Sequence, residues 1–246
     1  MLNTPEVFSF PSLKSTNTKL KELLLEGELS EFSVVITKNQ TAGRGQIGNS
    51  WESEQNKNLT FSIVLYPHFV KIHKQFRITQ LVTTALADVL APLIPGFCIK
   101  WPNDLYAGDK KLAGILIENT LTGPVISSTI IGIGLNVNQM KFRSNAPNPV
   151  SMKMITGKDY DIELLFQQIR QALFIRYIQW MEHGIKPIKK DYFKQLYRND
   201  GFYPFTDDNG TFTAKIDSVQ ETGHLLLTDL SGNQRTYAFK EVAFVL

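Results

Sequence analysis

The six residues Gly43-Arg44-Gly45-Gln46-Ile47-Gly48 constrain the fold of this chain more than any other segment. They match the pattern G-x-G-x-x-G and follow a predicted strand, as in a dinucleotide-binding βαβ unit. In that unit a helix begins at the third glycine and the chain returns as a parallel strand. Here a polar stretch over 49–58 leads directly into another predicted strand, over 59–66. A Rossmann fold is therefore not predicted. A P-loop is not predicted either, because no Gly-Lys-Ser/Thr sequence follows.

The glycine loop (residues 43–48) and the tryptophan after it nevertheless suggest a use. Glycines let backbone N–H groups approach an anion closely, and Arg44 supplies a bidentate donor for a carboxylate or a phosphate. Trp51 can pack against a flat ring. A surface loop that ends in a core tryptophan explains the same residues equally well, so this segment alone favours neither interpretation.

Composition limits the class of protein. The 246 residues are 43% hydrophobic and 20% charged, which is enough apolar material for a sizeable core. A single cysteine, Cys98, excludes an internal disulfide framework and a multi-cysteine zinc cluster. A net charge of +3 without blocks of like charge gives no reason to expect nucleic-acid binding. The sequence contains neither an apolar run of membrane-spanning length nor a basic, signal-like N-terminus, so we expect a cytoplasmic globular protein.

Hydrophobic periodicity divides the chain into a mixed part and an all-β part. The pattern predicts helices over 15–25, 75–90, 161–181 and 187–197, and strands over 32–37, 59–66, 97–101, 112–119 and 126–137. The third helix is expected to bury Leu164, Leu165, Ile169, Leu173, Ile175 and Trp180. From residue 201 onward, short strands alternate with turns at 208–210, 221–223 and 231–233. We therefore predict an α+β domain over residues 1–198 and a small β-barrel or sandwich over 199–246.

A second group of polar residues surrounds the end of the predicted strand over 97–101. Lys100, Asn103 and Asp104 lie there, and Lys111 begins the strand that returns after a hairpin turn. On paired strands Asp104 and Lys111 can face one site. Lys111 would then neutralise an anionic transition state, and the Asn103 amide and the Asp104 carboxylate would orient polar substrate groups. An exposed hairpin with solvated charges is the alternative.

Two glycines, Gly132 and Gly134, interrupt the predicted strand over 126–137. Glycine in a strand either lets another group approach the backbone closely or serves packing within the sheet. The sequence supports both interpretations.

Taken in order, these segments resemble the biotin–protein ligases. The resemblance rests on Ser15-Thr16-Asn17, Gln40-Thr41-Ala42-Gly43-Arg44-Gly45 with Trp51, Lys100-Trp101-Pro102-Asn103-Asp104, Lys111-Leu112-Ala113-Gly114-Ile115 and Ile131-Gly132-Ile133-Gly134-Leu135-Asn136. It runs from about Ser15 to Asn138 and resumes weakly near Glu241. It implies an α+β fold of the class II synthetase type, with a mixed β-sheet and helices packed on one side, followed by an SH3-like C-terminal β-barrel.

The resemblance also implies roles for individual residues. Biotin binding is implied for Ser15, Thr16, Asn17, Gln40, Arg44, Lys111 and Gly114. Binding of ATP or the adenylate is implied for Gly43, Arg44, Gly45, Gln46, Trp51, Asn103, Asp104, Lys111 and Asn136. Catalysis is implied for Lys111, Arg44 and Asp104, with Asp104 as our candidate to take the proton of the acceptor lysine. Residues 15–17 have an alternative role as helix caps.

The implied reaction has two steps. Biotin attacks the α-phosphate of Mg–ATP, which gives biotinyl-5′-adenylate and pyrophosphate, and a lysine of a biotin carboxyl carrier protein or domain of a biotin-dependent carboxylase then displaces AMP. ATP with Mg²⁺ and biotin thus enter as substrates, and no bound prosthetic group is implied. Whether residues of the protein itself bind a metal stays open. Residue 15 lies so near the start that we expect no DNA-binding domain and hence no DNA partner. Because no apolar run reaches membrane-spanning length, we expect no membrane partner either. Homodimer formation stays open.

One position departs from the family pattern. Many members read Gly-Arg-Gly-Arg, whereas this chain has Gln46, with Ile47 and Asn49 at downstream positions that are otherwise basic. We therefore expect weaker retention of the adenylate. Two other functions remain open: a lipoate or octanoate ligase or transferase of the same fold, and a non-catalytic binding module.

Overall fold

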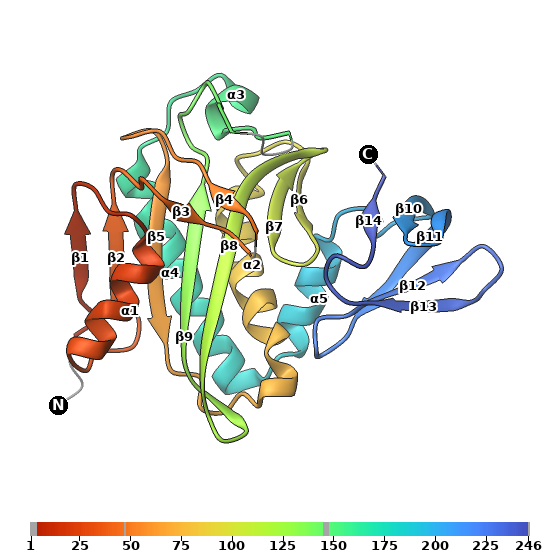
Figure 1. Ribbon diagram of the computed structural model, residues 1–246, viewed down its shortest axis with the longest axis horizontal. Coiled ribbons are helices and arrows are strands. Elements are labelled where there is room, and N and C mark those ends of the chain that lie inside the picture. Colours follow the sequence, from red (N-terminus) through yellow and green to blue (C-terminus); the bar gives the residue numbers. More distant parts are fainter. Residues whose placement is uncertain (1–3, 47, 145–147, 246) are drawn as a thin grey trace.

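A seven-stranded mixed sheet forms the centre of the molecule (Figure 1). The computed structural model describes residues 4–46, 48–144 and 148–245. Across the sheet the strands follow the order β1 (Val7–Phe10), β2 (Val34–Thr37), β5 (Leu59–Leu65), β9 (Val125–Leu135), β8 (Lys110–Thr122), β7 (Asp104–Ala107) and β6 (Phe97–Lys100). The β1–β2 pair is parallel and the other pairs are antiparallel. The sheet is therefore built mainly from hairpins, in agreement with the rejection of a Rossmann fold.

Helices cover both faces of this sheet. Neighbouring residues of a strand point to opposite sides, so the apolar residues on each side need a layer to pack against. One face packs against α1 (Thr16–Glu26) through a small cluster of Leu20, Val35, Val64 and Ile130. The opposite face carries the main core together with α2 (Phe76–Leu90), α4 (Ile162–His183) and α5 (Lys186–Lys194). Figure 1 shows these three helices behind the sheet and α1 in front of it. The mixed sheet with a helical layer is as expected, and α1 adds a helix on the face that carries the candidate site.

The burial of α4 differs in part from the prediction. Its N-cap Asp161 accepts hydrogen bonds from the backbone of residues 163 and 164, and most of the expected apolar residues are buried. Leu164 and Ile175 are 57% and 47% exposed, so the prediction for these two is wrong. Each residue turns the helix by about 100°, which rotates both side chains out of the buried stripe. Phe166 and Tyr177 complete that stripe instead.

The C-terminal part is a five-stranded antiparallel sheet. Its order is β13 (Gln234–Tyr237), β12 (Leu225–Asp229), β11 (Gly210–Val219), β10 (Tyr203–Asp207) and β14 (Ala243–Phe244). The three predicted turns join β10, β11, β12 and β13 in succession, which is consistent with an SH3-like domain. The predicted domain boundary at 198/199 falls in the connection between α5 and β10 and stays a prediction.

Several short elements were not predicted from the sequence. They are β1, a 3₁₀ turn (Ile72–Lys74), α3 (Met152–Thr156), and the small hairpin formed by β3 (Gly43–Arg44) and β4 (Ser50–Trp51). The hairpin carries the glycine loop over the front of the sheet, and Ile47 within that loop lies outside the described residues. Within the described ranges, no helix is long and apolar enough to cross a membrane.

Candidate active site

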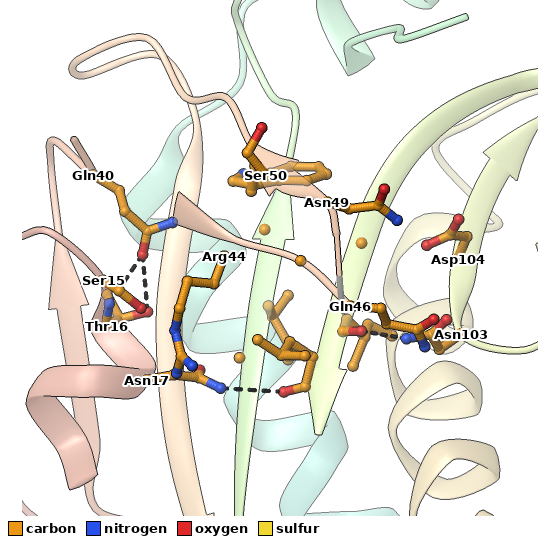
Figure 2. Close-up of a pocket in the computed structure, with 18 of the residues that line it drawn as sticks. Ser15, Thr16, Asn17, Gln40, Arg44, Gln46, Asn49, Ser50, Asn103 and Asp104 are labelled. Carbon is orange, nitrogen blue, oxygen red and sulfur yellow. Dashed lines mark hydrogen bonds between the residues drawn. The ribbon is translucent and has the colours of Figure 1, made fainter. Parts of the chain in front are cut away.

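A cavity opens on the α1 face of the sheet, over β8 and β9 (Figure 2). It contains about 690 Å³ of space, its open mouth included. The predicted site residues that line it are Ser15, Thr16, Asn17, Gln40, Arg44, Gly45, Gln46, Trp51, Asn103, Asp104, Lys111 and Gly114. Lining residues that were not assigned a role from the sequence are Asn49, Ser50, Ile115, Leu116, Gly132, Ile133, Gly134 and Phe239.

Gly43 and Asn136, both within the described ranges, stand behind the lining residues. A Cβ at Gly43 would collide with the Trp51 carbonyl and come within 2.7 Å of the Gln40 amide, so the β3–β4 hairpin closes only around glycine. Asn136 is 2% exposed and donates from Nδ2 to the Val150 carbonyl at 3.1 Å. Val150 in turn donates to the Lys111 carbonyl at 2.9 Å. Both residues therefore shape the site from outside the cavity.

The floor of the cavity depends on two glycines of β9. A Cβ at Gly132 would collide with the Asn17 amide, and a Cβ at Gly134 would collide with the indole ring of Trp51. Gly114 on the neighbouring strand β8 has the same function to a lesser degree, because a Cβ there would lie 3.1 Å from Trp51 Cζ3. The glycines therefore let other groups approach the strands closely, which decides between the two interpretations of this segment.

A network of neutral polar groups, the recognition corner, lies where α1 meets the sheet; it consists of Thr16, Asn17, Gln40 and Ser62. The Thr16 backbone N–H and hydroxyl donate to Gln40 Oε1 at 3.0 and 3.3 Å (Figure 2). The Ser62 hydroxyl lies 2.7 Å from Thr16 Oγ1 and 2.5 Å from Asn17 Oδ1. Ser62 is fully buried in β5, and sequence reasoning missed it because it sits inside an apolar run.

Two cations face the cavity, and each is paired with a carboxylate. Lys111 Nζ lies 2.8 Å from Asp104 Oδ2, and both side chains are 25% exposed. The β7–β8 pairing brings them together, with a bulge between residues 105 and 106, so the prediction that they face one site is confirmed. Arg44 Nη2 lies 2.8 Å from Glu118 Oε2 on β8. Sequence reasoning missed Glu118, because the loop and this strand meet only in the folded chain.

The turn between β6 and β7 is fixed from two sides. The Asn103 side-chain amide donates to the Ile115 carbonyl, which holds Asn103 against the cavity. Lys100 instead points toward the C-terminal part, with Nζ 4.6 Å from the centre of the Tyr106 ring and 5.3 Å from that of Phe244. Burial lowers the pKa of Lys100, although the nearby Asp104 carboxylate opposes this shift. Lys100 is therefore an anchor of the turn in this structure.

The C-terminal part contributes an aromatic ring to the cavity. Phe239 lines it and packs edge-on against Trp101 with ring centroids 6.1 Å apart. Trp101 also donates from its indole nitrogen to the Gly223 carbonyl at 2.9 Å. No motif marks Phe239, because it lies in a turn whose position depends on the packing of two separate sheets.

The hairpin is tied to a further segment through Glu52, which follows Trp51. Its carboxylate accepts hydrogen bonds from the backbone N–H groups of Arg143 at 3.0 Å and Ser144 at 2.7 Å. Burial alone would raise the pKa of Glu52, but these hydrogen bonds favour the charged form and the net pKa is lowered.

Among the described residues, no group of three or more His, Cys, Asp or Glu is placed to hold a metal ion.

A mixed sheet with a glycine-floored cavity, a polar recognition corner and two paired cations defines a site for a small, polar molecule. The chain belongs to the biotin/lipoate A/B protein ligase family, whose model matches residues 9–136. It is 30% identical over 233 residues to the bifunctional ligase/repressor BirA of Bacillus subtilis, a match that covers 91% of this chain and 70% of that protein. It is 27% identical to the biotin–[acetyl-CoA-carboxylase] ligase of Paracoccus denitrificans, over 90% of this chain and 94% of that protein.

A solved structure shows the same architecture. The biotin protein ligase from Aquifex aeolicus in complex with biotin and ATP superimposes with a TM-score of 0.79 at 25% sequence identity. The match covers 98% of each chain, so it includes both sheets.

Proposed function

We propose that this protein is a biotin–protein ligase that activates biotin with ATP and transfers it to a lysine of a biotin carboxyl carrier protein or domain. The observation that carries the proposal is the convergence of α1, the glycine loop and the β7–β8 hairpin on one cavity. The names of the relatives and the biotin and ATP in the solved Aquifex structure support the same activity.

The recognition corner suits biotin better than lipoate or octanoate. The ureido group of biotin offers two N–H donors and one carbonyl acceptor, and buried polar groups need partners of this kind. The hydroxyl and amide groups of Thr16, Asn17 and Gln40 in this corner, together with the neighbouring Ser15, can supply those partners. The dithiolane ring of lipoate and the alkyl chain of octanoate have no such donors and acceptors. Either acid would therefore leave the polar groups of the recognition corner unpaired.

In the first step, a carboxylate oxygen of biotin attacks the α-phosphorus of ATP and pyrophosphate leaves. The carboxylate and the triphosphate repel each other, so cations are needed between them, and Lys111 and Arg44 face the cavity for this purpose. Mg²⁺ is expected to arrive bound to ATP as part of that substrate. Gly45, Gln46 and Trp51 line the cavity, and we expect this segment to shield the mixed anhydride from water once the ligands are bound.

In the second step, the amine of the acceptor lysine attacks the acyl carbon of the adenylate, the bond from that carbon to the phosphate oxygen breaks, and AMP leaves. The nitrogen loses a proton, and the Asp104 carboxylate is our candidate acceptor. Its contact with Lys111 at 2.8 Å holds it at the cavity wall. Asn103, whose side chain donates to the Ile115 carbonyl, is our candidate to orient the nucleotide.

Transfer to a carrier domain tests the proposal. The protein is incubated with ATP, Mg²⁺ and biotin together with a biotin carboxyl carrier domain, and the product is analysed by mass spectrometry. We expect one biotin on the carrier, and none when the acceptor lysine is replaced by arginine. Modification of the carrier with lipoate or octanoate but not with biotin would contradict the proposal.

A further inference from the structure

We propose that Glu118 is a positioning residue that sets the direction of hydrogen bonding in the recognition corner, so that Asn17 presents an oxygen to the bound acid. This inference rests on the proposed function, because it concerns how the ureido group of biotin is read. Neither the motifs nor the cavity lining includes Glu118, which lies on β8 next to the cavity.

Two donors converge on one oxygen of Glu118. Asn17 Nδ2 donates to Oε2 at 2.7 Å, and Arg44 Nη2 donates to the same atom at 2.8 Å. Figure 2 shows the Arg44 side chain reaching down beside Asn17, so the loop and the start of α1 meet at this point. Asn17 is 3% exposed, and its Nδ2 also lies 3.4 Å from the Leu116 carbonyl.

A carboxylate accepts hydrogen bonds and does not donate them, whereas a carboxamide has a donor end and an acceptor end. Glu118 therefore holds the NH₂ group of Asn17 toward β8 through the shorter of its two hydrogen bonds, the longer one being to the Leu116 carbonyl. The Oδ1 atom is then turned toward Ser62, whose hydroxyl lies 2.5 Å away. An amide oxygen has two acceptor positions, and because Asn17 lines the cavity, the second would receive an N–H of a ureido ring in this proposal.

If Asn17 were reversed, its NH₂ group would face the N–H of the ligand, and two donors would be left opposed in a buried site. The amide cannot move toward β9 to relieve this opposition, because it already lies against Gly132 where a Cβ would be. The acceptor presented by Asn17 thus depends on a charge outside the cavity.

The ion pair itself contributes little to stability. The Arg44 and Glu118 side chains are 44% and 36% exposed, and exposed pairs of this kind typically contribute about 0–1 kcal/mol. The expected consequence of losing Glu118 is therefore a change in ligand affinity and not a loss of the fold.

The test compares Glu118→Gln with wild type in the binding of biotin and of biotinol, the alcohol analogue that lacks the carboxylate. Glutamine can offer either a donor or an acceptor, so Asn17 loses its strict acceptor partner, and on β8 only the Leu116 carbonyl at 3.4 Å still favours the original orientation. We expect the Kd for both ligands to rise about tenfold. In biotin-dependent ATP–pyrophosphate exchange, KM for biotin should rise by a similar factor, with kcat within about twofold of wild type.

A charge-exchanged variant provides the rescue. In N17D/E118Q, the new carboxylate on α1 offers only acceptor oxygens, and the new amide on β8 donates to one of them. We therefore expect the Kd for biotinol to return to within about threefold of wild type. Glu22→Gln is the matched control. It removes the same charge from an exposed ion pair on α1, with Lys19 at 3.3 Å, and should leave both Kd values unchanged.

Three results would overturn the role of Glu118. The first is unchanged affinity of E118Q for both ligands. The second is a loss of affinity for biotin but not for biotinol, which would indicate that Glu118 acts through Arg44 on the carboxylate of biotin. The third is no recovery of affinity in the double variant. Failure of the wild-type protein to bind biotin at all would instead contradict the proposed function, and with it this role. Wild-type binding together with an unchanged E118Q contradicts only the inference about Glu118.

Discussion

Replacement of Gly134 by alanine tests the close approach of Trp51 to the sheet. Gly134 lies in β9 and has no left-handed backbone conformation, so alanine fits its dihedral angles. The added Cβ would lie 2.5 Å from Trp51 Nε1 and 2.8 Å from Cζ2. Ordinary contacts between such atoms are about 3.5–4 Å, so the indole ring must withdraw by about 1 Å.

The ring can withdraw because it is carried by a short strand, β4, whose partner is β3. Overpacking in a rigid core costs about 1–3 kcal/mol, and movement of the hairpin should reduce this to below about 1 kcal/mol of unfolding free energy. A displacement of about 1 Å at an active site can cost about 100-fold in rate. We therefore expect kcat/KM to fall about 100-fold, equivalent to about 2.7 kcal/mol.

The assay is biotin-dependent ATP–pyrophosphate exchange, with urea unfolding on the same preparations. Gly114→Ala is the matched control, because its Cβ would come only to 3.1 Å from Trp51 Cζ3 and requires a shift of a few tenths of an ångström. We expect it to lose less than about threefold in kcat/KM. A G134A enzyme with wild-type kcat/KM, or one whose loss of activity merely follows a loss of folded protein, would refute the reasoning.

Three further predictions concern the rim of the site. Gln46 has a buried Oε1 without a hydrogen-bond partner among the described residues, and Q46R should slow release of the adenylate about tenfold by adding a charged donor; equal release rates would argue against this. Because the pKa of Glu52 is lowered by folding, the contribution of its carboxylate to stability is complete above about pH 4.5 and is lost as the pH falls through the lowered pKa. The difference in unfolding free energy between wild type and E52Q should therefore shrink between about pH 7 and about pH 3.5. A difference that stays constant over this range would contradict the prediction. D104N should slow transfer from preformed adenylate to the carrier at least about tenfold in single-turnover measurements, whereas an unchanged rate would exclude Asp104 as the proton acceptor.

The β7–β8 hairpin and the pair of Asp104 and Lys111 could be predicted because both depend on residues close together in the sequence. A turn sets the register of its two strands, and the register decides which side chains share a face. The sequence also showed that the glycine loop is not part of a dinucleotide-binding site, because the residues that follow it form a strand and not a helix.

Other parts of the site could not be predicted, because long-range packing creates them. Ser62 reaches Asn17 only when β5 lies between β2 and β9, and Glu118 meets Arg44 only when the β3–β4 hairpin folds over β8. Phe239 depends on how the C-terminal sheet packs beside Trp101. Each of these side chains has an ordinary local sequence context, so only the fold identifies it.

Exchange of labelled pyrophosphate into ATP tests the central claim most directly, because it reports formation of the acyl adenylate without an acceptor protein. We expect exchange by the wild-type protein with biotin and not with lipoate or octanoate. Lys111→Ala, which removes a cation from the cavity, should reduce that exchange at least about 100-fold. Exchange supported by lipoate or octanoate but not by biotin, or exchange with none of the three acids, would contradict the account.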